Sequence, residues 1–550
     1  MGKKKLAILS NVMTSLIGQK LRREYEIYIP EGFDTWVQEI INPASGLYLE
    51  NPDAIVVLLD GTEARSWTSV KEGEEKLSLW KQAVHMLAEK IDQVPVFIST
   101  IDIRENRIKA VSERKYAMEM AEKWYQFVQQ VSEKNTNIYV LDLAERIYDM
   151  GRNQFYSEKM WYMSSMPYSK EGLQAVAEEI KAVLDSAFKT RKKIIALDLD
   201  NTLWGGVIGE DGLEGIELSD HKEGQRFYDF QRQFLEMKNR GIVLAVTSKN
   251  NEEDVMEVFE KHPSMLLKEK DFVSLKINWN NKAANIKEIS KELNLTEGSF
   301  IFVDDNPIER ETVIGECAEV SVPDFPGDST MLQSFAEQIY KRYCRPLRIV
   351  GEDLKKTEMY QTEAKRKQDS VASLNLDDYI SRLEMEADIH RMLPEELERT
   401  AQLTNKTNQF NLTTKRYTAA EISAIEKEEG SAIYTVHSRD KYGDNGLISV
   451  LILKSSGNII KIDTFLMSCR VMGRKLEDVI INELAAFYKD KADKLQGEYI
   501  PTAKNSPVKD LYERLGFALL NESDHKQYEL DLKEYTKKEI GSYKEILFEG

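Results

Sequence analysis

The stretch IIALDLDNTLWGGVIGEDG, residues 194–212, constrains the fold most, because it sets two carboxylates at the end of an apolar segment. The run of β-forming residues before Asp198 predicts a buried strand. Side chains alternate along a strand, so Asp198 and Asp200 point to the same face. In an α/β fold, the carboxyl ends of parallel strands border the crevice where ligands bind. We therefore expect both carboxylates to lie in a ligand site.

These two carboxylates need a counter-charge, because two acids this close repel each other and one pKa rises unless a cation neutralises them. A hard divalent ion with oxygen ligands, Mg²⁺, is the usual solution. The alternative is an Asp-x-Asp turn that binds nothing. Ser248 closes the later apolar run IVLAVTS and can hydrogen-bond a phosphoryl oxygen, and Lys282 can offset negative charge. FVDDNP then places Asp304 and Asp305 at the end of another strand, which favours the metal site.

In this order the residues resemble the haloacid dehalogenase superfamily, whose pattern is Asp-x-Asp-x-Thr, then Ser or Thr, Lys and an acidic pair. The resemblance implies that Asp198 is a nucleophile that forms an aspartyl-phosphate, and that Asp200 is first the general acid and then the base. It implies that Lys282 and Mg²⁺ stabilise charge on the transferring phosphoryl group. The backbone carbonyl of Asp200 and the carboxylate of Asp304 would be metal ligands, with Asp305 a second ligand or a bridge through water.

The residues expected in this site fall into three groups. The expected catalytic residues are Asp198, Asp200, Ser248 and Lys282. The expected metal ligands are Asp198, Asp200, Asp304 and Asp305. The residues expected to contact substrate are Asn201, Thr202 and Asn250.

Six blocks in order resemble the FkbH-like proteins over residues 190–520: LDLDNTLWGGVIGEDG, TSKNN, FVDDNPIERE, TNKTNQFNLTTKRY, RDKYGDNGLI and MSCRVMGRKLE. This resemblance implies an enzyme that makes glyceryl units for polyketide and related pathways. It implies a small phosphorylated three-carbon substrate, 1,3-bisphosphoglycerate, and an acyl carrier protein whose phosphopantetheine arm receives the glyceryl unit.

Short apolar runs alternate with helical patterns in the first two thirds of the chain, which predicts parallel sheets and an α/β fold. Residues 1–187 are expected to form a flavodoxin-like or SGNH-hydrolase-like domain, and residues 188–348 a Rossmann-like haloacid dehalogenase fold. The motif gaps hold 47 and 33 residues, too few for a large cap domain. Residues 349–381 predict a helical linker, and residues 382–550 an α+β domain like that of the GNAT acetyltransferases.

In that last domain, RVMGRK at residues 470–475 resembles the acetyltransferase loop whose backbone amides bind a pyrophosphate at a helix start. The resemblance implies that Arg470, Gly473 and Arg474 bind substrate, although Lys475 stands where that loop has a small residue. The alternative is a solvated basic turn. NSPVKDLYERLGF, further along, matches a later element of the same fold.

Cys469 precedes Arg470, and this position allows two interpretations. A thiol beside an arginine near a helix start has a lowered pKa and could hold an acyl group as a thioester, which would make Cys469 catalytic. A free cysteine is also commonly an inert small hydrophobe. Cys317 and Cys344 lack such neighbours and are expected to be structural. Three widely spaced cysteines form neither a disulfide framework nor a zinc site.

The first domain resembles SGNH hydrolases in strand order, but its chemistry looks lost. ILSNVMTS stands where a Gly-Asp-Ser block is expected, and WYMSSMPYSKEGL contains no histidine where the base is expected. We favour a scaffold or docking role over Ser10 as a nucleophile.

A net charge of −18 argues against nucleic acid or an anionic membrane as partner. The first apolar run is short and predicts a strand rather than a signal peptide, and no run is long enough to span a bilayer, so we expect a cytoplasmic protein. Two functional alternatives to glyceryl transfer remain. One is a Mg²⁺-dependent phosphatase and acyltransferase acting on a sugar or cell-envelope phosphate ester, and the other is a non-enzymatic scaffold.

Overall fold

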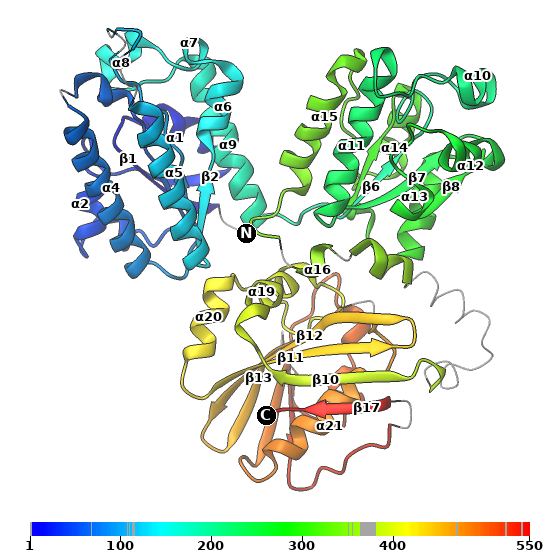
Figure 1. The fold of residues 1–550 in the computed structure, drawn as a ribbon. Helices are drawn as coiled ribbons and strands as arrows, with labels where there is room; N and C mark the ends of the chain where they lie inside the picture. The colour runs from blue at the N-terminus through cyan, green and yellow to red at the C-terminus, as the bar shows by residue number, and fades with distance from the viewer. Residues whose placement is uncertain are drawn as a thin grey trace. The chain divides into compact units, whose positions relative to one another are not determined.

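The computed structural model contains three β-sheets, each accompanied by helices (Figure 1). The chain divides into two compact units, residues 1–189 with 417–424 and residues 190–416 with 425–550. No helix among the described residues is both long and apolar enough to cross a membrane. The structure describes residues 3–550 with the exception of 68, 107, 109, 113–115, 350, 355, 363–380, 469–470, 523–524 and 541–542.

The first sheet has five parallel strands in the order β2-β1-β3-β4-β5, which is the flavodoxin-like order and confirms the predicted fold class. Its strands are β1 (Lys4–Ser10), β2 (Tyr25–Tyr28), β3 (Ala54–Leu58), β4 (Val96–Ser99) and β5 (Ile138–Leu141). Its helices are α1 (Ser15–Leu21), α2 (Trp36–Ile41), α3 (Gly46–Leu49), η1 (Thr62–Ser66), α4 (Val70–Lys90), α5 (Ala117–Lys134), α6 (Leu143–Met150), α7 (Arg152–Phe155), α8 (Glu158–Ser164) and α9 (Lys170–Phe188).

Polar side chains gather at the carboxyl end of this sheet. Asp102 forms an ion pair with Arg152, in which Nε lies 2.9 Å from Oδ2. Ser10 Oγ donates to the carbonyl of Leu58 at 2.6 Å rather than to a histidine. This places the Ser10 hydroxyl in a backbone contact, in keeping with the preference for a scaffold role.

Asp60, just beyond β3, is buried and supports a prediction on stability. Burial raises the pKa of its carboxyl to about 6, with the charge of Asp102 adding to the rise and hydrogen bonds from Thr62 opposing it. The folded state therefore keeps a proton that the unfolded state loses between about pH 4 and pH 6, so this group destabilises the fold at neutral pH. Asp60→Asn is expected to raise the free energy of unfolding at pH 7 by up to about 3 kcal/mol.

The gain from Asp60→Asn should shrink as the pH falls from about 6 to below about 4, where the wild-type carboxyl becomes protonated in both states. Urea unfolding of both proteins across this pH range measures it. Asp149→Asn, a change at an exposed aspartate of the same unit, should show no such pH-dependent difference. A constant difference between Asp60→Asn and wild type would contradict the prediction.

The second sheet has four parallel strands in the order β8-β7-β6-β9, which confirms the Rossmann-like class. Its strands are β6 (Ile194–Leu197), β7 (Val243–Ser248), β8 (Phe272–Ile277) and β9 (Phe300–Val303). Its helices are α10 (Ile208–Gly215), η2 (Lys222–Gly224), α11 (Gln225–Asn239), α12 (Glu252–Lys261), η3 (Glu269–Asp271), α13 (Lys282–Glu292), η4 (Glu297–Ser299), α14 (Pro307–Glu316), η5 (Ser329–Met331), α15 (Leu332–Ile339) and the π-helix η6 (Tyr340–Cys344).

Alternation along β6 builds two cores, one on each face of this sheet. Ile195 and Leu197 belong to the core that includes α11 and α15, whereas Ile194 and Ala196 belong to the core that includes α13 and α14. Burial on both faces is what a parallel strand with an uninterrupted apolar run requires. Residues 201–281 are all described and contain no domain-sized insertion, which confirms the expected absence of a large cap.

The third sheet is mixed, with eight strands in the order β15-β16-β14-β13-β12-β11-β10-β17, and the pairs β13–β14 and β10–β17 are parallel. Its strands are β10 (Met385–Arg391), β11 (Ser431–Asp440), β12 (Gly443–Ser456), β13 (Ile459–Met467), β14 (Lys494–Tyr499), β15 (Ala518–Glu522), β16 (Lys526–Asp531) and β17 (Tyr543–Phe548). The helices in this part are η7 (Pro394–Glu396), α19 (Leu397–Lys406), α20 (Ala419–Lys427), α21 (Leu476–Tyr488), η9 (Ser506–Val508) and α22 (Leu511–Arg514).

Helix α21 is buried against the third sheet, with Leu476, Ile480 and Leu484 fully inside its core. A mixed sheet with one long buried helix is an α+β arrangement, as the sequence predicts for residues 382–550. The predicted linker, residues 349–381, is helical at α16 (Gly351–Leu354), and residues 363–380 of it lie outside the described residues.

Candidate active site

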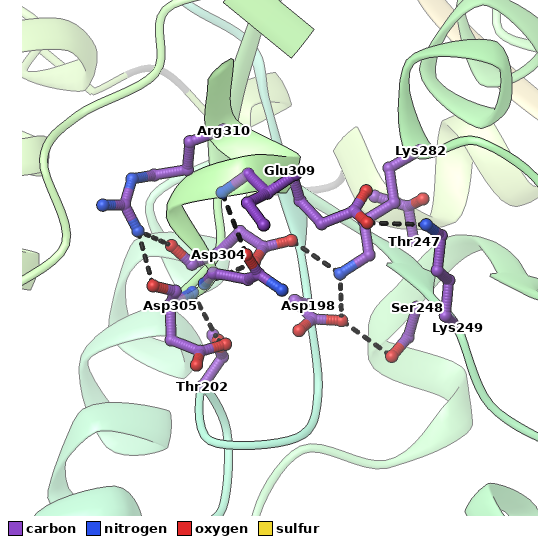
Figure 2. Close-up of polar contacts among 12 residues, drawn as sticks. Asp198, Thr202, Thr247, Ser248, Lys249, Lys282, Asp304, Asp305, Glu309 and Arg310 are labelled. Atoms are coloured by element: carbon purple, nitrogen blue, oxygen red, sulfur yellow. Dashed lines mark hydrogen bonds and ion pairs between the residues drawn. The ribbon is translucent and has the colours of Figure 1, made fainter. Parts of the chain in front are cut away.

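Four side chains meet at the carboxyl edge of the second sheet (Figure 2). Asp198 directly follows β6, and its backbone amide donates to the carbonyl of Val303 at 3.0 Å, which extends the pairing of β6 with β9. Ser248 ends β7, and Lys282 is the first residue of α13. Asp304 follows β9. Segments far apart in sequence therefore deliver one carboxylate pair, one hydroxyl and one amine to a single point.

These four groups are in direct contact. Ser248 Oγ donates to Asp198 Oδ1 at 2.7 Å. Lys282 Nζ lies 2.8 Å from Asp198 Oδ1 and 2.6 Å from Asp304 Oδ2, so it bridges the two carboxylates. All four side chains are buried, and Asp304 has no exposed surface. Asn250 Nδ2 donates to Ser248 Oγ at 3.1 Å and orients the hydroxyl. The structure thus brings Asp198, Ser248, Asn250, Lys282 and Asp304 together.

Hydrogen bonds fix the positions of Asp304 and Asp305, the acidic pair that follows β9. The amide of Asn306 donates to Asp304 Oδ1 at 2.8 Å, and Thr202 Oγ1 lies 3.4 Å from Asp305 Oδ1. Thr202 is fully buried and also accepts from the Asp305 amide at 3.2 Å. Thr202, expected to contact substrate, positions the acidic loop in this structure through these two contacts.

Arg310 fixes the same loop and was not identified from the sequence. Its Nη1 donates to the carbonyl of Asp304 at 2.8 Å and to that of Asp305 at 2.6 Å (Figure 2). The neighbouring Glu309 pairs with Lys249, whose Nζ lies 2.6 Å from Oε1. Both residues lie in the first turns of α14, and no local sequence pattern marks them for these contacts.

Asp200 is turned toward the loop that follows the strand. Its Oδ1 accepts from Trp204 Nε1 at 2.9 Å and from the amide of Ile208 at 3.1 Å. Asn201 adopts a positive φ of 53° and its side chain accepts from the Gly206 amide at 3.0 Å, so it shapes this turn. Asp200 and Asn201 thus fix the conformation of this loop. Trp204 also belongs to the site, and it was not identified from the sequence.

The site holds more negative charge than its lysine neutralises. Burial raises the pKa of Asp304, the charge of Asp198 also raises it and Lys282 opposes the rise, and together these effects place the pKa at about 7. Burial also raises the pKa of Asp305 and of Asp200. Burial lowers the pKa of Lys282, but its two carboxylate partners outweigh that effect and raise it.

This charge balance fits a divalent cation. One carboxylate oxygen from each of Asp198, Asp304 and Asp305 lies within 4.8 Å of the others. Hard oxygen donors with excess negative charge are what Mg²⁺ prefers. The Asp200 side chain is not part of this group, because its Oδ1 is hydrogen-bonded to the loop.

The predicted residues of the last domain are placed differently. Cys469 and Arg470 lie outside the described residues. Gly473 has a φ of 76°, a conformation that favours glycine. Arg474 is buried, and its Nη1 lies 3.2 Å from Asp440 Oδ2, so its guanidinium forms an internal ion pair. Lys475 precedes α21 in the left-handed conformation.

Comparisons with known proteins found two kinds of match. Residues 5–185 match the family model of the FkbH N-terminal domain. This match lies before residues 190–520, which carry the six blocks that resemble FkbH-like proteins, and it adds a second likeness to the same family. The crystal structure of the N-terminal part of the protein BF1531 from Bacteroides fragilis, which contains a phosphatase domain complexed with Mg, is 27% identical. It covers 63% of this chain and 95% of its own, with a TM-score of 0.57.

Acetyltransferase structures also match part of the chain. The ribosomal-protein-S18-alanine N-acetyltransferase from Escherichia coli is 11% identical and covers 28% of this chain and 99% of its own, with a TM-score of 0.22. The spermidine N-acetyltransferase from Vibrio cholerae is 13% identical and covers 26% and 95%, with a TM-score of 0.22. No curated protein matches the chain.

Proposed function

We propose that the second sheet carries a Mg²⁺-dependent phosphatase whose nucleophile is Asp198. The observation that carries this is the contact network in which Ser248 and Lys282 both reach Asp198 Oδ1 while Lys282 also holds Asp304. A structure 27% identical to this chain contains a phosphatase domain complexed with Mg, which supports the proposal.

The contacts assign a task to each residue. Because Ser248 and Lys282 hold Oδ1 of Asp198, the other carboxylate oxygen is the one that attacks phosphorus. A bond forms between that oxygen and phosphorus as the bond from phosphorus to the leaving oxygen breaks. Asp200, whose raised pKa favours the protonated form, gives its proton to the leaving oxygen. It then takes a proton from the water that hydrolyses the aspartyl-phosphate.

Asp198, Asp304 and Asp305 would hold the metal. When bound, Mg²⁺ supplies positive charge to the phosphoryl oxygens. Lys282 adds a fixed charge beside Asp198, and Ser248 contributes a hydroxyl that can turn to a phosphoryl oxygen. Burial keeps these charges in a low-dielectric setting, where they act more strongly than in water.

We further propose that this centre serves glyceryl transfer. The thiol of an acyl carrier protein would attack the acyl carbon of 1,3-bisphosphoglycerate and expel inorganic phosphate from that carbon. If Cys469 takes the acyl group first, the Cys469 thiol expels the phosphate, and the carrier thiol then displaces the thiol of Cys469 from the thioester. The phosphatase would hydrolyse the phosphate ester that remains on the three-carbon unit. The FkbH N-terminal domain and the absence of a cap over the described residues 201–281 support a substrate tethered to a macromolecule.

Incubation of the full chain with 1,3-bisphosphoglycerate, Mg²⁺ and a panel of carrier proteins tests the transfer. We expect an intact-mass shift on one carrier equal to a glyceryl thioester. Cys469→Ala should abolish loading if Cys469 holds the acyl group, whereas normal loading by this variant would assign the attack to the carrier thiol. The alternative sugar or cell-envelope substrate would be favoured by two results together. No carrier in the panel would be modified, and a sugar phosphate would be hydrolysed far faster than phosphoglycerates.

A further inference from the structure

A second group of side chains that could hold a metal ion lies on the third sheet, and it shares no residue with the acidic group at the second sheet. His390 lies on β10 and His437 on the neighbouring antiparallel strand β11. Asp388 is directly opposite His437 in this pair of strands, so His390, two positions on, shares a face with His437. Glu396, in η7, reaches the same face.

The three side chains converge on one oxygen atom. His437 Nε2 lies 2.6 Å from Glu396 Oε1, and His390 Nε2 lies 3.1 Å from the same oxygen. The two imidazole rings stack with centroids 5.5 Å apart and an angle of 19° between their planes. One potential ligand atom from each of the three residues lies within 4.8 Å of the other two.

Outer contacts fix these groups in a ligand-like orientation. Asp388 Oδ1 lies 3.3 Å from His390 Nδ1, a contact that holds a proton on Nδ1. The Thr435 hydroxyl and the Leu393 amide donate to Glu396 Oε2 at 2.8 and 2.9 Å, which leaves Oε1 to face the imidazoles. Metal-binding histidines and carboxylates in proteins are oriented by outer hydrogen bonds of this kind.

The Glu396 carboxylate and the His390 imidazole together favour a cation between them. Glu396 accepts hydrogen bonds from the Leu393 amide and the Thr435 hydroxyl, which are donors that suit an ionised carboxylate. A neutral His390 with its proton on Nδ1 turns the Nε2 lone pair toward the carboxylate oxygen, which is repulsive. Either a second proton or a metal ion at this point removes the repulsion.

We propose that His390, Glu396 and His437 bind Zn²⁺. Two imidazole nitrogens and one carboxylate oxygen form a ligand set that suits Zn²⁺, whereas Mg²⁺ prefers oxygen alone. The side chain of Glu396 is 9% exposed and that of His390 13%, while that of His437 is 34% exposed. The site is therefore reachable from the side of His437, and three protein ligands leave a fourth position for water or an anionic group.

Zinc titration of the full chain tests this site. The protein, with any affinity tag removed, is stripped with a chelator and titrated with Zn²⁺ in excess Mg²⁺, and bound zinc is counted by mass spectrometry after dialysis. We expect one retained equivalent in the wild type and an affinity at least about 100-fold lower in His437→Ala. Co²⁺ in place of Zn²⁺ should give visible absorption bands that the same variant loses.

Matched variants separate this site from other sources of binding. His221 is exposed and lies 2.9 Å from Asp220, so His221→Ala removes a histidine beside a carboxylate and should leave zinc binding unchanged. Glu396→Gln should weaken binding as His437→Ala does, which covers the case in which one variant fails to fold. Asp304→Asn should retain the zinc.

Three results would overturn the assignment. Equal zinc retention by wild type, His437→Ala and Glu396→Gln would place the ion elsewhere, as would its loss in Asp304→Asn. Failure of the wild type to retain zinc would leave only a hydrogen-bonded cluster of two histidines and a carboxylate. None of these outcomes depends on phosphatase or transferase activity.

Discussion

Asp198→Asn is expected to lower the rate of phosphate release by about 10⁴-fold or more, because it removes the attacking charge while keeping the shape of the side chain. Lys282 keeps its contact with Asp304 at 2.6 Å in this variant, so the amine stays paired. The free energy of unfolding should therefore change by no more than about 1–2 kcal/mol. Steady-state phosphate release and urea unfolding of the same preparation measure both effects.

Asp324→Asn is the matched control for this experiment, because Asp324 is an exposed aspartate of the same domain. It should release phosphate at the wild-type rate. Chelation of Mg²⁺ should mimic Asp198→Asn in the wild type. If Asp198→Asn turned over substrate like Asp324→Asn, the nucleophile would be another residue.

Lys282→Met is expected to damage stability as well as activity. Lys282 joins two buried carboxylates, and its own side chain is 4% exposed. Its removal leaves Asp198 and Asp304 facing each other without a shared cation, which should lower the free energy of unfolding in chelator by about 3–5 kcal/mol. Loss of its charge at the phosphoryl group should lower the turnover rate by about 10²–10³-fold.

The stability loss in Lys282→Met should depend on pH and on Mg²⁺. The pKa of Asp304 is about 7 in the wild type, and loss of Lys282, which opposes the rise, moves this pKa higher. The folded variant therefore holds a proton that the folded wild type releases above about pH 7, so the stability loss should be smaller near pH 6 and larger at pH 8. Mg²⁺ should stabilise the variant more than the wild type, because it restores the missing charge. Urea unfolding at both pH values, with chelator or Mg²⁺, measures these differences.

Lys276→Met provides a control with the same geometry near the surface. Lys276 also bridges two carboxylates, with Nζ 2.7 Å from Glu288 and 2.5 Å from Glu292, but those partners are 55% and 39% exposed. Its loss should cost no more than about 1 kcal/mol and leave turnover unchanged. Equal destabilisation by both variants would show that burial of the Asp198 and Asp304 pair does not matter.

The carboxyl ends of the strands could be predicted because apolar runs of strand length stand immediately before the polar residues. Asp198, Ser248 and Asp304 each follow such a run, and parallel pairing brings these ends to one edge. Strand β2 was not predicted, because YEIY is a short edge strand with only one buried residue and carries a charge. An edge strand needs less apolar surface than a central one, so its pattern is weak.

Two kinds of contact could not be predicted, one within a short segment and one between segments that are far apart in the sequence. Arg310 reaches two backbone carbonyls of its own loop, and Trp204 reaches Asp200, through local geometry that no residue pattern encodes. His390 and His437 become neighbours only through the pairing of β10 with β11. Their separation in sequence matches no metal-binding motif, so only the register of the sheet reveals the cluster.

Trapping of the phosphorylated enzyme tests the central claim most directly. The chain is mixed with a phosphate ester and Mg²⁺, quenched within milliseconds, reduced with borohydride and digested for mass spectrometry. Borohydride reduces an aspartyl-phosphate to the alcohol, so we expect the side chain at Asp198 alone to be converted, and only when substrate is present. Conversion at another residue, or rapid phosphate release with Asp198 never modified, would contradict the account.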